Sequence, residues 1–103
     1  MHILIADAFD AKLPERLAAF GTVSSDMATL GQANVLLVRS KTKVTPELLA
    51  QAPGLKLVIR GGVGMDNVDK KACAEKGVKA VNTPKASSVA VAEMAMAFMV
   101  AIP

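Results

Sequence analysis

The 103-residue sequence contains no tryptophan and no tyrosine, and its only aromatic residues are three phenylalanines. Single-stranded nucleic acids are usually bound by basic grooves lined with aromatic residues, on which the bases stack. A flavin site likewise calls for aromatic side chains beside the ring. The twelve Lys and Arg residues are scattered and leave a formal net charge of only +3. The composition therefore argues against nucleic acid as a partner and against a flavin protein.

Cysteine and histidine occur once each, at Cys73 and His2. One cysteine cannot form an internal disulfide, so a reducing cytoplasm is the expected location. Cys73 falls in a helical pattern without a nearby histidine, which predicts a buried structural thiol rather than a nucleophile. His2 begins a predicted strand, far from the edge of the sheet where ligands bind. We therefore expect no catalytic residue and no metal site in this chain.

Long apolar segments are also scarce. The residues before Asp7 are too few, and have the wrong flanks, for a signal peptide. The apolar stretch from Val89 to Ile102 is short for a membrane span but long enough for a buried helix. No membrane association is expected.

Short runs of aliphatic residues recur along the chain, with helical patterns between them. The runs predict five strands: Ile3–Ala6, Thr22–Ser24, Val35–Val38, Leu57–Ile59 and Val78–Val81. Helix signals lie between them: Pro14 to Gly21, an irregular turn over 26–33, a cap at Thr45 before Pro46, and a cap at Asp69 with Gly77 at the far end. Alternation of this kind predicts an α/β fold with a doubly wound parallel sheet. Five strands in a flavodoxin-like order are expected by analogy, because periodicity does not reveal strand order.

The final segment differs from the rest of the chain. Residues 1–86 read as the α/β domain, and residues 87–103 read as a long helix with one charged residue, Glu93. A helix that is apolar all round must be covered all round, and one small sheet covers a single side. We therefore expect the chain to be a fragment, with this helix leading to an absent domain. We also expect a homo-oligomer that packs residues 87–102 against a second copy.

Ligands of open α/β sheets bind beyond the carboxyl ends of the strands. The strongest signal there is Arg60-Gly61-Gly62-Val63-Gly64, directly after a strand. Glycines allow a sharp turn that brings N–H groups close to an anion such as a carboxylate. A simple Gly-rich connection is the alternative. The segment is not a dinucleotide fingerprint, because Asn67 stands where the third glycine should be.

Two further loops could contribute. Arg39 offers a two-pronged contact to a phosphate or carboxylate, with the hydroxyl of Ser40 beside it. A solvated charged loop is the alternative there. In the loop from Asn82 to Ser88, Asn82 could bind its own backbone, and the serines could simply cap the final helix.

Three strings in order, VRSKTKVTPELL (38–49), LKLVIRGGVGMDNVD (55–69) and VKAVNTPKASSVAVAEMAMAFM (78–99), resemble the D-isomer-specific 2-hydroxyacid dehydrogenases. Around Arg39, the chain is most similar to the phosphoglycerate dehydrogenase branch, which serves serine biosynthesis. The resemblance implies a substrate-binding domain that joins an NAD-binding domain in the full-length enzyme. No cofactor is then expected for this chain alone.

The resemblance also implies roles for particular residues. The amides of Gly62, Val63 and Gly64 would hold the substrate carboxylate, and Val63 would lie near the nicotinamide. Arg39, Ser40 and Arg60 would bind the phosphorylated end of a small 2-hydroxy or 2-keto acid. The family's catalytic arginine, glutamate and histidine would come from the missing domain, so the chain alone should be inactive. Ser87 replaces an asparagine that is common in the family.

Two other interpretations remain open. A receiver-type signalling domain shares this fold, and Asp7 and Asp10 suit its acidic cluster, but Arg39 stands where its phosphoacceptor aspartate should be. The chain could also be an excised or engineered folding unit that binds no ligand.

Overall fold

The computed structural model describes residues 2–7, 12–39, 41–62, 66–83 and 88–101. The strands expected from the sequence are present, as β1 (His2–Ile5), β2 (Thr22–Ser24), β3 (Val35–Val38), β4 (Leu57–Gly61) and β5 (Lys79–Thr83). Their order in the sheet is β2-β1-β3-β4-β5, and neighbouring strands run parallel. This is the flavodoxin-like order, so the predicted fold class is confirmed.

Helical segments connect the strands: α1 (Lys12–Leu17), the 3-10 turns η1 (Ala18–Phe20) and η2 (Met27–Gln32), α2 (Pro46–Ala50), α3 (Lys70–Glu75) and α4 (Ser88–Ala101). The predicted caps are confirmed. Thr45 accepts the N–H of Leu48 through its hydroxyl, and the Asp69 carboxylate accepts the N–H of Ala72. Side-chain acceptors of this kind satisfy donors that the first helical turn leaves unpaired.

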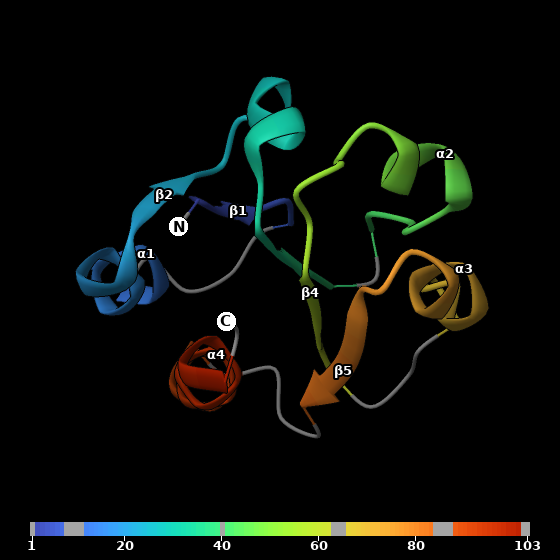
Figure 1. Ribbon diagram of the computed structural model, residues 1–103. Helices are drawn as coiled ribbons and strands as arrows, with labels where there is room; N and C mark the ends of the chain where they lie inside the picture. Colours follow the sequence, from blue (N-terminus) through green and yellow to red (C-terminus); the bar gives the residue numbers. More distant parts are fainter. Residues whose placement is uncertain (1, 8–11, 40, 63–65, 84–87, 102–103) are drawn as a thin grey trace.

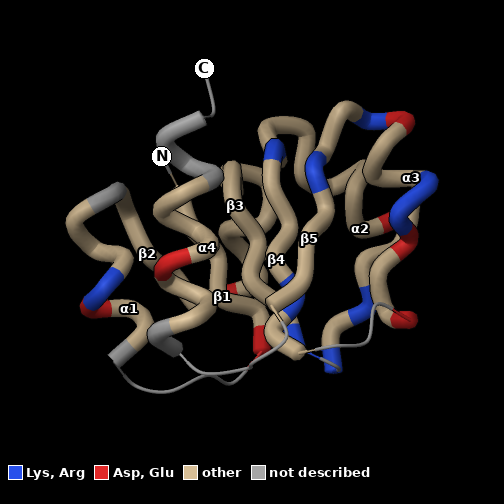
Figure 2. Tube along the Cα trace, turned by 90° about the horizontal axis from the view of Figure 1, so that it is seen from below, with Lys and Arg blue, Asp and Glu red and all other residues tan. Residues whose placement is uncertain are grey.

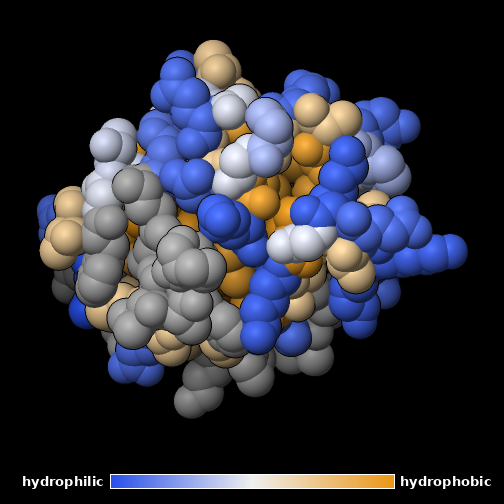
Figure 3. Space-filling model, in the orientation of Figure 1, coloured by the Kyte–Doolittle hydropathy of each residue, from blue (hydrophilic) through white to orange (hydrophobic). Residues whose placement is uncertain are grey.

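The helices cover both faces of the sheet (Figure 1). One face packs against α1 and α4 and includes Ile3, Leu37 and Ile59. The opposite face, with Leu36 and Val58, packs against η2, α2 and α3. Successive residues of a strand point to opposite faces, so strands covered on both sides need apolar residues at every position. In the view of Figure 3, hydrophilic residues (blue) lie around the outside, and the most hydrophobic residues (orange) show between them in the middle.

Helix α4 lies beside α1 on the same face of the sheet (Figure 1). Val91, Ala92 and Ala95 are buried there, whereas Glu93 and Ala97 are exposed. The sheet and α1 thus already cover one side of this helix within the chain. Of the described ranges, no helix has the length and apolarity that crossing a membrane requires.

Two strands are longer than the sequence suggested. β4 continues through Arg60 to Gly61, and β5 continues through Asn82 to Thr83, because these residues pair with one another across the two strands. Arg60 and Asn82 were expected in loops, so their placement is corrected. Both side chains are half-buried at the end of a strand, which restricts their positions more than a loop would.

Cys73 is fully buried in α3. Burial, and then the nearby negative charge of Asp69, raise the pKa of its thiol above the ordinary value. A thiol that resists ionisation is a poor nucleophile, and the predicted burial of Cys73 is confirmed.

Candidate functional site

Charged residues gather where β1, β3 and β4 end, at the carboxyl edge of the sheet (the lower edge in Figure 2). Asp7 follows β1, Arg39 follows β3, and Arg60 is the next-to-last residue of β4. Parallel pairing brings these three ends side by side. This is the edge at which α/β proteins bind ligands.

The carboxylate of Asp7 holds the loop that follows β3. Its Oδ2 accepts the N–H groups of Arg39 and Thr42 at 2.7 and 2.9 Å, and its Oδ1 accepts the Thr42 hydroxyl. Asp7 is only 7% exposed. Burial alone raises the pKa of this carboxyl group, but the hydrogen bonds from Thr42, Arg39 and Lys41 outweigh it and lower the pKa below its ordinary value.

Asn67 holds the same loop from the opposite side. Its Nδ2 donates to the carbonyl oxygens of Arg39 and Thr42, the latter at 2.7 Å. Its Oδ1 accepts the Nε–H of Arg60 at 3.2 Å. One short side chain therefore joins the loop after β3 to an arginine of β4.

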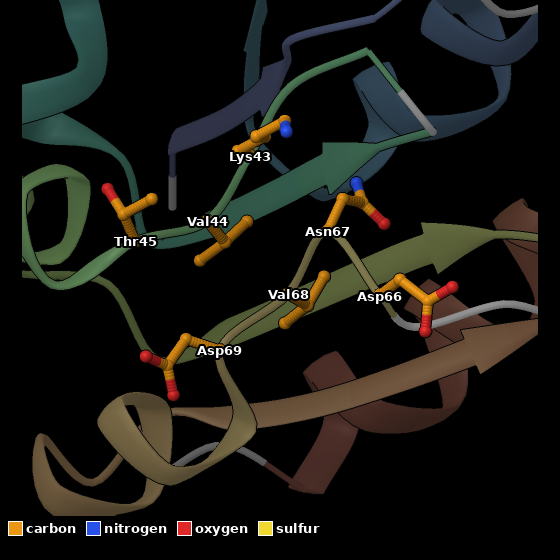
Figure 4. Close-up of a pocket in the computed structure, with 7 residues that line it drawn as sticks. All are labelled: Lys43, Val44, Thr45, Asp66, Asn67, Val68 and Asp69. Carbon is orange, nitrogen blue, oxygen red and sulfur yellow. The ribbon is translucent and has the colours of Figure 1, made fainter.

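The backbone of the loop after β3 is also paired with the backbone of the loop after β4. The N–H of Val44 donates to the carbonyl of Asn67 at 2.7 Å, and the N–H of Asp69 donates to the carbonyl of Val44 at 2.9 Å. Val44 and Val68 form a parallel bridge beyond the main sheet. Figure 4 shows these two segments side by side. Together they form a hollow of about 290 Å³, which is lined by Lys43, Val44, Thr45, Asp66, Asn67, Val68 and Asp69.

Arg60 is folded back over the glycine-rich loop. Its Nη1 donates to the carbonyl of Gly61 at 3.0 Å. Gly62 has a φ of 126°, which side-chain-bearing residues rarely adopt. A Cβ at Gly62 would lie 2.1 Å from Nη1 of Arg60. Glycine at this position thus permits both the turn and the close approach of the guanidinium.

Both backbone groups of Gly62 already have partners within the chain. Its N–H donates to the carbonyl of Thr83 at 2.8 Å, and its carbonyl accepts from Nδ2 of Asn82 at 3.1 Å. Asn82 therefore bonds across to the neighbouring loop, whereas the sequence suggested that it could bond to its own backbone. The Gly62 amide extends the pairing of β4 with β5 and is not directed at a ligand.

The structure places the other predicted site residues as follows. Arg39 and Arg60 are brought together at one edge, whereas Ser40, Val63 and Gly64 lie outside the described residues. His2 begins β1 at the opposite edge of the sheet, and its Nε2 is buried without a hydrogen-bond partner. Within the described ranges, no three His, Cys, Asp or Glu residues form a group that could hold a metal ion.

Sequence reasoning missed two residues that organise this edge, Asp7 and Asn67. The sequence marks Asp7 as a candidate for the acidic cluster of a receiver domain and Asn67 as the residue in place of a third glycine, but it assigns neither of them a structural bond. Short polar side chains at strand ends often bond to nearby backbone groups. This tendency could have marked both residues as partners of a nearby backbone. It could not have shown that both side chains bond to the same distant loop.

Known proteins match this chain. Residues 8–99 match the model of the catalytic domain of the D-isomer specific 2-hydroxyacid dehydrogenases. A hydroxypyruvate reductase from Thermotoga maritima is 45% identical over 75 residues, which is 73% of this chain and 24% of that protein. A D-3-phosphoglycerate dehydrogenase from Methanocaldococcus jannaschii is 52% identical over 69 residues, or 67% of this chain and 13% of that protein. The chain thus spans a quarter or less of these relatives.

Solved structures of similar proteins agree on the fold. An NAD⁺-bound 3-phosphoglycerate dehydrogenase from Entamoeba histolytica has a TM-score of 0.69 at 22% identity, with 81% of this chain and 32% of that chain covered. An NADPH-dependent glyoxylate/hydroxypyruvate reductase from Sinorhizobium meliloti, crystallised with NADP and malonate, has a TM-score of 0.67 at 25% identity and covers 82% and 28%. The chain belongs to the family of D-isomer specific 2-hydroxyacid dehydrogenases.

Proposed function

We propose that this chain is the substrate-binding part of an NAD-dependent D-2-hydroxyacid dehydrogenase, and that its substrate is phosphorylated, with 3-phosphoglycerate as the first candidate. The observation that carries the proposal is that the Asn67 side chain bonds both to the main-chain carbonyl of Arg39 and to the guanidinium of Arg60 at the carboxyl edge. Two arginines at the ends of neighbouring strands suit a phosphate better than a single carboxylate. The names of the relatives, which include phosphoglycerate dehydrogenases, agree with this choice.

Within this proposal the residues have different tasks. Arg39, Ser40 and Arg60 bind the phosphate. The amides of Val63 and Gly64 bind the carboxylate, because the Gly62 amide is already bonded to Thr83. Gly62 then contributes the sharp turn that directs the amides after it.

In this proposal the NAD cofactor is not bound by the loop after β4. A dinucleotide-binding loop needs a third glycine so that a helix can approach its strand closely, and Asn67 occupies that position with a side chain bonded to both loops. We therefore assign NAD binding to polypeptide outside this chain, with Val63 on the side of the nicotinamide. His2, the single histidine, lies at the wrong edge for acid–base chemistry. The chain alone should not oxidise phosphoglycerate with NAD.

The proposal is tested by titrating the chain with 3-phosphoglycerate and following its amide signals by NMR. We expect saturable shifts at Arg39 and at Gly61 to Gly64, with millimolar affinity, roughly −4 kcal/mol, since half of the cleft is absent. Glycerate, which lacks the phosphate, should bind more weakly.

Arginine variants sharpen the test. Arg39→Gln and Arg60→Gln should each weaken phosphoglycerate binding by about tenfold, the equivalent of one charged contact of about 1.4 kcal/mol. Arg16→Gln removes the same charge from an exposed position on α1 and should leave binding unchanged. If the amide signals of these loops do not shift with 3-phosphoglycerate, the chain is better explained as a folding unit that binds no ligand. If glycerate binds as tightly as 3-phosphoglycerate, the phosphate is not recognised and that part of the proposal is wrong.

Three further expectations stay predictions: a cytoplasmic location, the division at residue 86, and a homo-oligomer through residues 87–102. For the oligomer, the described part of α4 presents Glu93 and Ala97 outward, so any contact with a second copy would include an ionised side chain. The receiver interpretation is set aside, because Arg39 follows β3 and Asp7 is bonded to the loop after it.

A further inference from the structure

We infer that Asn67 is a positioning residue that fixes the Arg39 loop against Arg60, so that the two arginines bind ligand as one unit. This inference rests on the function proposed above, and it names a residue that does not itself need to contact the ligand.

The Asn67 side chain uses both of its polar atoms between the two loops. Nδ2 donates to the carbonyls of Arg39 and Thr42, and Oδ1 accepts from the Nε of Arg60. One end of the amide thus bonds to the loop after β3 and the other to the side chain of Arg60 in β4, so the loop cannot shift away from Arg60 without breaking one of these bonds.

Asp7 completes the restraint. It accepts the N–H groups of Arg39 and Thr42, the same two residues whose carbonyls bond to Asn67. Arg39 and Thr42 are therefore each held through the N–H by Asp7 and through the carbonyl by Asn67. Because the arginine side chain is long and flexible, fixing its backbone reduces the conformational freedom that binding must remove.

The amino edge of the sheet offers a matched control. Asn34 makes a comparable pair of contacts there: Oδ1 accepts the N–H of His2 at 2.8 Å, and Nδ2 donates to the carbonyl of Gly54 at 3.1 Å. Like Asn67, it uses both ends of its side-chain amide to join segments distant in the sequence, but both of its partners are backbone groups and it lies at the edge opposite the arginines. Loss of stability alone should therefore be similar in Asn34→Ala and Asn67→Ala.

The first measurement is binding of 3-phosphoglycerate to the two variants, followed by amide NMR. Asn67→Ala should bind about fivefold more weakly than the wild type, which corresponds to about 1 kcal/mol, and Asn34→Ala should bind like the wild type. Wild-type binding that is retained in Asn67→Ala, or lost equally in both variants, would overturn the positioning role while the proposed function stands.

The second measurement needs no ligand. In the wild type the Nε–H signal of Arg60 should be protected from exchange by its bond to Asn67. Asn67→Asp keeps the oxygen that accepts this bond but cannot donate to the Arg39 and Thr42 carbonyls. We expect the Arg60 signal to persist in Asn67→Asp and to be lost in Asn67→Ala, with faster amide exchange across residues 39–42 in both.

The two measurements separate the possible failures. If the wild type binds no phosphoglycerate, the proposed function fails and the role of Asn67 in binding fails with it. The exchange data then still decide whether Asn67 joins the loops. Unchanged amide exchange at residues 39–42 in both variants would refute the claim that Asn67 holds the loop after β3, regardless of the binding result.

Discussion

The two edges of the sheet are held by different chemistry. At the amino edge, the partners of the Asn34 side chain among the described residues are main-chain groups of His2 and Gly54. At the carboxyl edge, the buried carboxylate of Asp7 and the guanidinium of Arg60 take part as well. Neutral contacts are therefore sufficient to align the starts of strands. The charged network lies at the edge that carries the two arginines, which is expected if it serves the proposed ligand as well as the fold.

The largest expected effect on the difference between the two edges comes from removing the Asp7 carboxylate. Asp7→Ala leaves the N–H groups of Arg39 and Thr42 and the Thr42 hydroxyl without their acceptor. Hydrogen bonds to a charged group contribute about 1.5–3 kcal/mol, so we expect the free energy of unfolding to fall by about 2–3 kcal/mol. Urea denaturation measures the loss.

The control for this variant is Asp66→Ala, because Asp66 is an exposed carboxylate near the same edge. Its replacement should change stability by no more than about 0.5 kcal/mol. Equal losses in the two variants would show that overall charge, rather than the bonds of Asp7, matters at this edge.

Acid should have a smaller effect than deletion, because a protonated Asp7 keeps its oxygens as acceptors. The pKa of Asp7 is lowered in the folded protein from 3.8. Its charge therefore contributes stability that is fully present above pH 3.8 and is lost as the pH falls through the lower folded-state pKa. Urea denaturation midpoints should be measured from pH 6 downward, so that the interval includes this range. As the pH falls, the midpoint should decline more steeply in the wild type than in Asp7→Asn. Parallel curves would contradict this.

Elements of the fold were predictable where the pattern was local. The aliphatic runs at Val35–Val38 and Thr22–Ser24 gave strands with the expected bounds, and Thr45 and Asp69 cap helices as predicted. Each of these signals depends on residues a few positions apart. Strand order came only from family analogy, because non-local pairing leaves no mark in periodicity.

The site was predictable only in part, for the same reason. Position after a strand marked Arg39, and glycine spacing marked Gly62, but neither pattern shows which groups are already bonded. The Gly62 amide bonds to Thr83, and Asn67 reaches a loop 28 residues away along the chain. Contacts over such separations depend on how the strands are arranged, and that arrangement is visible only in three dimensions.

The smallest expected effect compares two glycines, one near each edge. Gly62 has a φ of 126° at the carboxyl edge, and Gly77 has a φ of 73° between α3 and β5. Alanine at either position should cost about 1 kcal/mol, because side chains disfavour such backbone angles. A Cβ at Gly77 meets nothing within 4 Å, whereas a Cβ at Gly62 would displace the guanidinium of Arg60. Gly62→Ala should therefore also weaken phosphoglycerate binding, and Gly77→Ala should not. If both variants bind like the wild type, then the close approach of the Arg60 guanidinium to Gly62 has no part in ligand binding. The two edges would then differ only in what they contribute to stability.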